Sequence, residues 1–207
     1  MTRVCILDYG SGNVKSVYNL IASLAPHVTI SNEVAGIEAA THIILPGVGA
    51  FAASMRRIND KLPLDVLRQQ VLVQKKPFLG ICVGMQVLME TGLEFGETPG
   101  LGWLPGRVEK LESGGMPLPH IGWNNISVDK SKPLIPLLAG LDADPDFYFV
   151  HSFICRPQDP ALVQATTDYG QQFCSVIARD NIFGVQFHPE KSQRAGIRLA
   201  KNFLALS

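Results

Sequence analysis

The sequence predicts a mixed α/β fold, built on a parallel sheet that helices cover on both faces. Apolar runs of strand length alternate with segments of helical periodicity through the first half of the chain. These runs are apolar at successive positions, which is typical of parallel strands buried on both faces. The second half is richer in Gly and Pro, carries short strand-like runs and ends in one more helical segment.

In the first half, the expected strands and helices alternate. Continuous apolar runs predict strands at residues 3–9, 28–30, 42–45 and 77–81. Apolar residues recur at helical spacing in two stretches between these strands, which are Val14, Val17, Leu20, Ile21 and Leu24, and then Leu64, Leu67, Val71 and Leu72. Strands that alternate with helices in this way indicate βα units.

In the second half, the expected elements are shorter. Gly and Pro are frequent between residues 92 and 145, and helical periodicity fades there. Strands are expected at residues 107–111, 125–128, 147–154, 173–179 and 182–187. A last helix is expected at residues 194–206, with an inward face formed by Ile197, Leu199, Ala200, Phe203 and Leu204. No repeat or linker divides the chain, so residues 1–207 are expected to form one domain.

Composition argues against several classes of protein. The 18 basic and 18 acidic residues cancel, which disfavours a nucleic-acid-binding face or a basic membrane-binding patch. No apolar run reaches the roughly 20 residues of a membrane span, and Asp8 interrupts the first run too early for a signal peptide. The four cysteines form no C-x-x-C pair, so neither a disulfide framework nor a zinc site is expected. A reducing cytoplasm fits this pattern best.

The strongest local signal is the segment Gly80-Ile81-Cys82-Val83-Gly84. It follows an apolar strand run and precedes a helix-prone stretch, as in a nucleophile elbow with Cys in place of Ser. The glycines allow a tight turn that holds the nucleophile in strained backbone angles. The Val83 N–H would face the forming oxyanion, and the helix start favours the thiolate of Cys82. The other cysteines lie in apolar runs without such glycines and are expected in the core: Cys5, Cys155 and Cys174.

A cysteine nucleophile needs a base and a group that orients the base. Of the five histidines, only His188 has suitable neighbours, in the sequence His188-Pro189-Glu190. Pro189 favours extended geometry for His188, and in an extended chain Glu190 projects to the same side. Its carboxylate could fix the imidazole tautomer and stabilise the imidazolium. The sequence therefore predicts a catalytic triad of Cys82, His188 and Glu190.

Two further segments carry paired glycines. Pro46-Gly47-Val48-Gly49 follows an expected strand, so it would lie at the carboxyl end of the sheet, where open α/β sheets bind ligands. Its backbone is expected to supply the second oxyanion donor, from Val48 or Gly49. The other segment, residues 8–13, resembles half of a dinucleotide fingerprint, but Lys15 occupies the place of the third glycine. A tight turn is the better interpretation of that segment.

Together, these motifs resemble the class I, or triad, glutamine amidotransferase family. The loop at residues 46–49, the elbow around Cys82 and the late His-Pro-Glu follow the order and spacing of that family across essentially the whole chain. Further segments resemble the branch of the family that serves histidine biosynthesis, namely residues 8–13, 119–124, 148–152 and 188–192. The resemblance implies a central mixed sheet flanked by helices, no metal and no organic cofactor. It also implies that Gln86 and Glu94 help to hold the substrate glutamine.

The resemblance further implies a partner. In that branch a barrel-shaped cyclase receives the ammonia, and free ammonia at neutral pH would protonate and be lost as a nucleophile. Delivery must therefore be enclosed, which favours a glutaminase docked on its partner. The expected contact residues are Lys191 and the Pro-flanked loop at residues 120–124, which comprises His120, Trp123 and Asn124. Trp is the residue type most expected at the centre of an interface.

Three alternatives remain open at this stage. A Cys-His hydrolase that acts alone, such as a peptidase or a γ-glutamyl hydrolase, is disfavoured by Glu190 and by the loop at residues 46–49. A non-catalytic scaffold is disfavoured by the intact triad. A glutaminase subunit for another aminating partner is the third alternative. The glutaminase of pyridoxal phosphate synthesis carries Gly-Gly-Glu-Ser where this chain has Pro-Gly-Val-Gly, but a paralogue in surface-sugar synthesis is compatible with the sequence.

Overall fold

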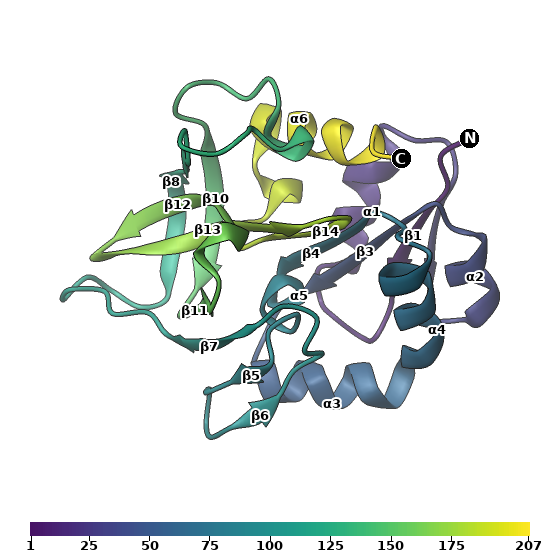
Figure 1. Ribbon diagram of the computed structural model, residues 1–207, viewed down its shortest axis with the longest axis horizontal. Helices are drawn as coiled ribbons and strands as arrows, with labels where there is room; N and C mark the ends of the chain where they lie inside the picture. The colour runs from purple at the N-terminus through teal and green to yellow at the C-terminus, as the bar shows by residue number, and fades with distance from the viewer.

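The computed structural model describes residues 1–207, and its central feature is an eight-stranded mixed sheet (Figure 1). The strand order is β2-β1-β3-β4-β14-β13-β12-β9. The parallel part comprises β2 (Val28–Ser31), β1 (Val4–Leu7), β3 (His42–Gly47), β4 (Phe78–Cys82) and β14 (Ile182–Val185). The antiparallel extension comprises β13 (Gln171–Arg179), β12 (Val163–Tyr169) and β9 (Ser127–Val128). The mixed sheet implied by the family resemblance is therefore confirmed.

Helices cover both faces of the parallel part (Figure 1). One face carries α1 (Val14–Ala22) and α6 (Gln193–Leu204), and the other carries α2 (Val34–Ala39), α3 (Phe51–Lys61) and α4 (Leu64–Arg68). A π-helical turn, Gln69–Val73, extends α4. The buried side chains of α1 follow the helical spacing that the sequence predicts, with Val14, Val17 and Ile21 toward the sheet. None of the helices combines the length and the apolarity needed to cross a membrane.

Two small sheets lie beside the antiparallel end of the central sheet. In the first, β8 (His120–Asn125) pairs antiparallel with β10 (Asp146–His151). In the second, the order is β11 (Phe153–Pro157), β7 (Gly106–Lys110), β5 (Thr91–Gly92) and β6 (Thr98–Pro99). The short helices are α5 (Val83–Gln86) and the 3₁₀ turns Pro136–Leu138, Pro160–Leu162 and Pro189–Lys191. These small sheets matter because β10, β11 and the segment between them border the pocket described below.

The structure corrects several of the expected elements. The strand expected at residues 147–154 is two strands, which Ser152 divides and which join different sheets. His120 begins β8, although the flanking Pro119 suggests a loop. Ile197, expected on the inner face of α6, is 39% exposed, because Gly196 takes the inner position. A side chain at that glycine would meet the carbonyl of Pro189.

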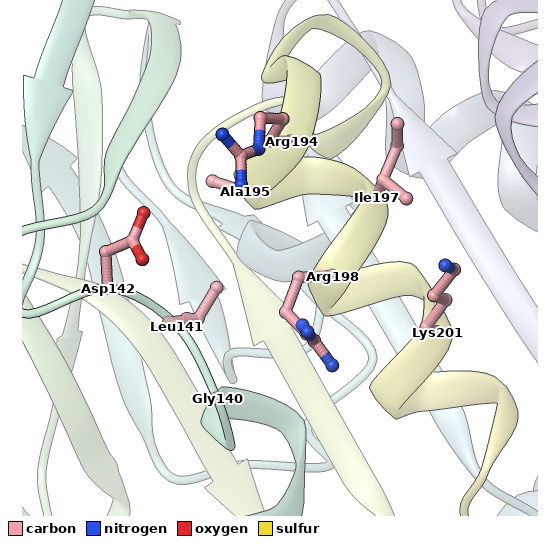
Figure 2. Close-up of a pocket in the computed structure, with 8 residues that line it drawn as sticks. All are labelled: Gly140, Leu141, Asp142, Arg194, Ala195, Ile197, Arg198 and Lys201. Atoms are coloured by element: carbon pink, nitrogen blue, oxygen red, sulfur yellow. The ribbon is translucent and has the colours of Figure 1, made fainter.

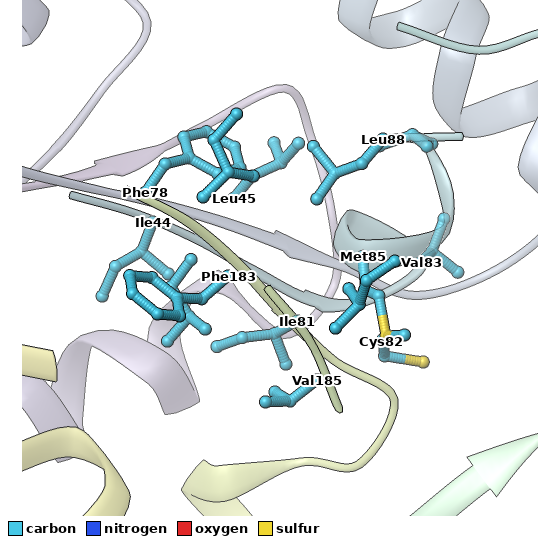
Figure 3. Packing of buried hydrophobic residues seen from close by; sticks show 14 of the residues in the cluster. Ile44, Leu45, Phe78, Ile81, Cys82, Val83, Met85, Leu88, Phe183 and Val185 are labelled. Carbon is cyan, nitrogen blue, oxygen red and sulfur yellow. The ribbon is translucent and has the colours of Figure 1, made fainter. Parts of the chain in front are cut away.

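The core is a single continuous cluster that includes both faces of the parallel strands. Figure 3 shows the part around β3, β4 and β14, where Ile44, Ile81, Phe183 and Val185 lie on one face of the strands and Leu45 and Phe78 lie on the other. Cys82 lies at the edge of this cluster, at the carboxyl end of β4. Burial on both faces explains why the parallel strands read as continuous apolar runs.

Candidate active site

Cys82 occupies a sharp turn from strand to helix. It is the last residue of β4, and α5 begins at the next residue. Its φ of 54° and ψ of −113° are angles that a non-glycine residue rarely adopts. Figure 3 shows the Cys82 sulfur pointing away from the aliphatic side chains of the sheet. The segment therefore has the geometry of a nucleophile elbow.

The two glycines that bracket Cys82 are required by close backbone contacts. A Cβ atom on Gly84 would lie 1.8 Å from the carbonyl oxygen of Leu45, and one on Gly80 would lie 2.4 Å from the carbonyl oxygen of Gly84. Both obstacles are backbone atoms, so a larger residue could not be accommodated by a side-chain rotation. The glycines thus allow α5 to pack directly on the end of β3 and hold the turn in place.

His188 and Glu190 form a fully buried pair. His188 Nδ1 lies 2.8 Å from Glu190 Oε1, and neither side chain is exposed to solvent. His188 has the extended backbone that Pro189 predicts, with φ −105° and ψ 95°. The chain then enters the 3₁₀ turn Pro189–Lys191, so a turn, rather than a continuing extended chain, brings Glu190 back to His188. The expected contact exists, but the structure corrects the route by which it forms.

The titration of His188 depends on two neighbours. Burial lowers the pKa of His188, but the nearby sulfur of Cys82 and the hydrogen-bonded carboxylate of Glu190 outweigh burial and raise it to about 10. The protonated form of His188 is therefore favoured at this position beside Cys82. Its Nε2 is buried and makes no hydrogen bond, while Nδ1 is held by Glu190. Nε2 is thus the atom available for proton transfer.

Segment 8–13, for which the sequence predicts only a tight turn, also contributes to this site. Asn13 Nδ2 donates a hydrogen bond to Glu190 Oε1 at 3.2 Å. Ser11 Oγ donates to Asn13 Oδ1 at 2.9 Å. Sequence reasoning missed both residues. The sequence feature that could have revealed them is a run of polar side chains directly after β1. This run lies at the carboxyl edge of the sheet, where open α/β sheets bind ligands.

A pocket of about 340 Å³ opens beside Cys82. It is lined by residues that the sequence assigns to the oxyanion hole and to substrate binding, which are Val48, Gly49, Val83, Gln86 and Glu94. The remaining lining comes from Pro119 and from residues 150–153 between β10 and β11. The structure therefore brings together segments that lie up to about 100 residues apart around one sulfur atom.

Both expected substrate-binding side chains are held in fixed orientations. Gln86 Nε2 donates to the carbonyl of Phe153 at 2.9 Å and to Gln186 Oε1 at 3.0 Å. The carbonyl oxygen of the Gln86 amide is therefore left for a ligand. Glu94 Oε2 accepts a hydrogen bond from the Phe51 N–H at 2.7 Å, at the start of α3. Glu94 is thus anchored at the pocket wall, and its other oxygen remains available for an ammonium group.

The loop expected to supply the second oxyanion donor does not offer Val48 to the pocket in this conformation. The Val48 N–H donates to Ser11 Oγ at 3.1 Å. The next residue, Gly49, has a φ of 100°, and a Cβ atom there would meet nothing within 4 Å. Glycine can adopt this positive φ and many other backbone angles, and the open space around Gly49 leaves the Val48–Gly49 backbone few side-chain constraints on that side.

The expected partner-contact residues divide into two groups. Trp123 is 48% exposed, and its ring lies edge-on to Tyr148 with 6.1 Å between centroids. Lys191 is also exposed, and its Nζ lies 5.3 Å from the centroid of the Tyr148 ring. We call Trp123, Tyr148 and Lys191 the aromatic patch. An exposed Trp next to a Tyr is typical of a protein-binding surface.

The other two residues do not present such a surface. His120 is only 2% exposed and stacks on the rings of Tyr169 and Phe149, so little of its surface is available to a partner. This burial disfavours the expected role of His120 as a contact residue, because the segment forms a strand whose first side chain points inward. The side chain of Asn124 is committed to the carbonyl of Asp168 through a hydrogen bond of 2.9 Å.

Cys82 is expected to be the only cysteine that forms a covalent adduct with a glutamine-like electrophile. Burial raises the pKa of Cys5 to about 11 and that of Cys174 to about 12, and it raises the pKa of Cys155 well above the ordinary range. The test is to map the labelled peptides by mass spectrometry after treating the native chain. Label found mainly on one of these three buried cysteines would contradict the assignment of Cys82 as nucleophile.

A second hollow, of about 230 Å³, lies between α6 and the loop after Pro136–Leu138 (Figure 2). Figure 2 shows the basic side chains of Arg194, Arg198 and Lys201 on one side and Asp142 across from them. The hollow contains no Cys, Ser, Thr or His and shares no residue with the pocket beside Cys82. It is therefore not the candidate active site.

Comparison with known proteins finds matches that cover nearly the whole chain. The model of the family described as "Glutamine amidotransferase class-I" matches residues 5–206. The imidazole glycerol phosphate synthase subunit HisH of Rhodospirillum rubrum is 43% identical, over 98% of this chain and 98% of that protein. The imidazole glycerol phosphate synthase subunit HisH 2 of Pseudomonas aeruginosa is 41% identical, over 98% of this chain and 99% of that protein.

Solved structures resemble the chain at lower identity. A crystal structure of a glutamine amidotransferase superposes with a TM-score of 0.74 at 19% identity and covers 97% of this chain and 96% of that one. The structure of PurLQS from Thermotoga maritima gives a TM-score of 0.70 at 18% identity and covers 98% and 97%. At these identities the likeness establishes the fold alone.

Proposed function

The chain belongs to the class I glutamine amidotransferase family, and from this premise we propose that it is the glutaminase subunit of an imidazole glycerol phosphate synthase. The observation that supports this most is that the strained Cys82 borders a pocket and has the buried His188–Glu190 pair close to it. The names of the relatives that match over their full length point to the same synthase. The proposal treats residues 1–207 as one catalytic domain that works in the cytoplasm without a metal or organic cofactor.

The first half of the reaction forms a thioester and releases ammonia. Cys82 Sγ attacks the side-chain amide carbon of glutamine, and the carbonyl electron pair moves onto oxygen. The Val83 N–H and a donor from the Val48–Gly49 stretch stabilise the resulting oxyanion. His188 donates a proton to the amide nitrogen, the carbon–nitrogen bond breaks, and ammonia leaves.

The second half of the reaction regenerates the enzyme. His188, now neutral, takes a proton from water while the water oxygen attacks the thioester carbon. The carbon–sulfur bond breaks, glutamate leaves, and Cys82 returns to its resting state. Glu190 keeps Nδ1 of His188 protonated and stabilises the imidazolium, so that Nε2 alone exchanges protons. Gln86 and Glu94 hold the amino-acid end of the substrate.

The proposed partner is the barrel-shaped cyclase subunit of the same synthase, in a heterodimer. The cyclase combines the ammonia with a phosphorylated ribulosyl formimino intermediate and forms imidazole glycerol phosphate and an aminoimidazole carboxamide ribotide. The aromatic patch supports a docking surface on this side of the chain, because exposed Trp and Tyr residues are enriched at interface centres. Enclosure between the two subunits would protect ammonia from protonation.

Replacement of Cys82 by Ala tests whether this chain only releases ammonia while the cyclase forms the ring. The complex with Cys82→Ala is expected to lose glutamine-dependent synthesis and to keep synthesis from added ammonium salts at alkaline pH. The reason is that Cys82 serves only to release ammonia. Cys5→Ala is the matched control, since Cys5 is buried in β1 away from the pocket, and it should keep both activities. An assembled Cys82→Ala complex that ammonium cannot rescue would contradict the proposal.

A further inference from the structure

Two buried histidines outside the triad, His120 and His151, form a cross-strand pair between β8 and β10. His120 Nδ1 lies 3.2 Å from His151 Nε2. The rings of Tyr169 and Phe149 stack on the His120 ring with centroid distances of 4.0 Å and 5.0 Å. His120 is 2% exposed and His151 is 6% exposed. Both rings are therefore held in one orientation, and every ring nitrogen faces a hydrogen-bonding partner within the protein.

Two backbone carbonyls fix the direction of these hydrogen bonds. The carbonyl of Phe153 lies 3.0 Å from His151 Nδ1 and can only accept, so the proton of His151 is on Nδ1. His151 Nε2 must then accept from the Nδ1–H of His120, which leaves His120 Nε2 unprotonated. Asn124 Nδ2 faces that atom at 3.3 Å and also donates to the carbonyl of Asp168 at 2.9 Å. The proton positions deduced from the Phe153 carbonyl therefore agree with those deduced from the Asn124 amide.

This arrangement requires both histidines to be neutral. An extra proton on His151 Nε2 would face the Nδ1–H of His120, and an extra proton on His120 Nε2 would face the amide N–H of Asn124. Burial lowers the pKa of His120 to about 4. Burial, and then the neighbouring His120, lower the pKa of His151 to about 3. At neutral pH the pair is therefore a fixed relay of donors and acceptors.

The relay continues from Phe153 to Cys82. The Phe153 carbonyl that accepts from His151 also accepts from Gln86 Nε2 at 2.9 Å. Gln86 Nε2 donates in addition to Gln186 Oε1 at 3.0 Å. Because its oxygen is occupied in this way, Gln186 turns its amide nitrogen toward Cys82 Sγ, at 3.7 Å. The orientation of both glutamine amides thus follows from one carbonyl group.

We propose that His120 and His151 are positioning residues, which fix Gln86 and Gln186 so that Gln186 donates a hydrogen bond to the Cys82 sulfur and the Gln86 carbonyl faces the pocket. They act through the Phe153 carbonyl. His151 is also part of the pocket wall, but both of its ring nitrogens face partners within the protein. A correctly turned Gln186 amide stabilises the thiolate, since a donor facing an anionic acceptor forms a strong hydrogen bond. The consequence for catalysis rests on the glutaminase function proposed above, whereas the hydrogen-bond pattern does not.

The proton positions can be read directly by nitrogen NMR of the full-length chain with labelled histidine. At neutral pH, His120 and His151 are each expected to give the signature of a neutral ring with the proton on Nδ1. Assignment uses His120→Asn and His151→Asn, each of which removes one set of signals. Imidazolium signals, or neutral rings with the proton on Nε2, would overturn the direction of the relay and with it the proposal.

The positioning role is tested by the rate at which iodoacetamide alkylates Cys82 at fixed pH. His151→Leu is expected to slow alkylation about tenfold, because a disordered Gln186 no longer donates a hydrogen bond to the Cys82 sulfur. His151→Asn places an N–H near the position of Nδ1 and should restore most of the rate. His42→Leu is the matched control. It also removes a buried histidine, which hydrogen-bonds Thr41 and Leu206 far from Cys82 along the sheet.

Wild-type alkylation in folded His151→Leu, or equal slowing in His42→Leu, would overturn the proposal. If His151→Leu does not fold, Gln186→Leu removes the last donor of the relay, and a wild-type rate in that variant would also overturn it. These readouts need neither glutamine nor a partner. A chain that shows the expected tautomers and alkylation rates but hydrolyses no glutamine would refute the proposed function and leave the relay established.

Discussion

Replacement of His188 by Ala is expected to reduce glutamine hydrolysis by several powers of ten, nearly as much as Cys82→Ala. Without His188 the site loses the group that protonates the leaving nitrogen and activates water. The raised pKa of His188, about 10, reflects its interactions with Cys82 and Glu190, so its removal also takes away the cation that stabilises the thiolate. The test is the turnover of glutamine by each variant with the partner present.

Glu190→Gln should be about two orders of magnitude less damaging than His188→Ala, since an orienting residue usually contributes less than the base itself. The amide oxygen of Gln can still accept from His188 Nδ1 and from Asn13 Nδ2, as Glu190 Oε1 does. What is lost is the negative charge that stabilises the imidazolium. His27→Ala is the control, because His27 is exposed and its side chain makes no hydrogen bond. Near wild-type hydrolysis by His188→Ala would rule out the triad.

The parts of the site that could be predicted from sequence are those set by local geometry. The elbow at Cys82 was predictable because both glycines lie within five residues of chain at a strand-to-helix turn, although the atom that Gly84 must avoid belongs to Leu45 of β3. The His188–Glu190 contact was predictable because the residues are two apart, although the intervening turn was not. The parallel strands were predictable because burial on both faces gives continuous apolar runs.

The remaining parts depend on contacts between distant segments. Asn13 and Glu190 are 177 residues apart, and Gln86 and Gln186 are 100 apart, so no spacing rule connects them. A buried polar residue gains its role from the partner that satisfies it, and that partner is fixed only when the sheets assemble. His120 shows the same limit. Its Pro-flanked sequence suggests an exposed loop, whereas pairing with β10 turns its side chain into the protein.

The isolated chain is expected to hydrolyse glutamine slowly, and the cyclase partner with its own ligand bound should raise the rate about 10²-fold or more. The structural reason lies in the loop at residues 46–49. The Val48 N–H is held by Ser11 Oγ and cannot also face an oxyanion, yet Gly49 has free space around it. A rotation of the backbone at Val48 and Gly49 would turn an N–H group into the pocket as the second oxyanion donor. One such donor lowers the activation barrier by about 3 kcal/mol. A donor that turns inward only on docking prevents wasteful release of ammonia.

The decisive measurement compares glutaminase rates with and without the liganded partner in three chains. Wild type should show the full stimulation. Ser11→Ala removes the acceptor that holds the Val48 N–H, so its basal rate should rise and its stimulation factor should fall. Trp123→Ala should keep the wild-type basal rate and lose stimulation, because the half-exposed indole lies on the aromatic patch and not in the pocket. Full activity of the isolated wild-type chain would eliminate gating by the loop, and full stimulation of Trp123→Ala would exclude that residue from the interface.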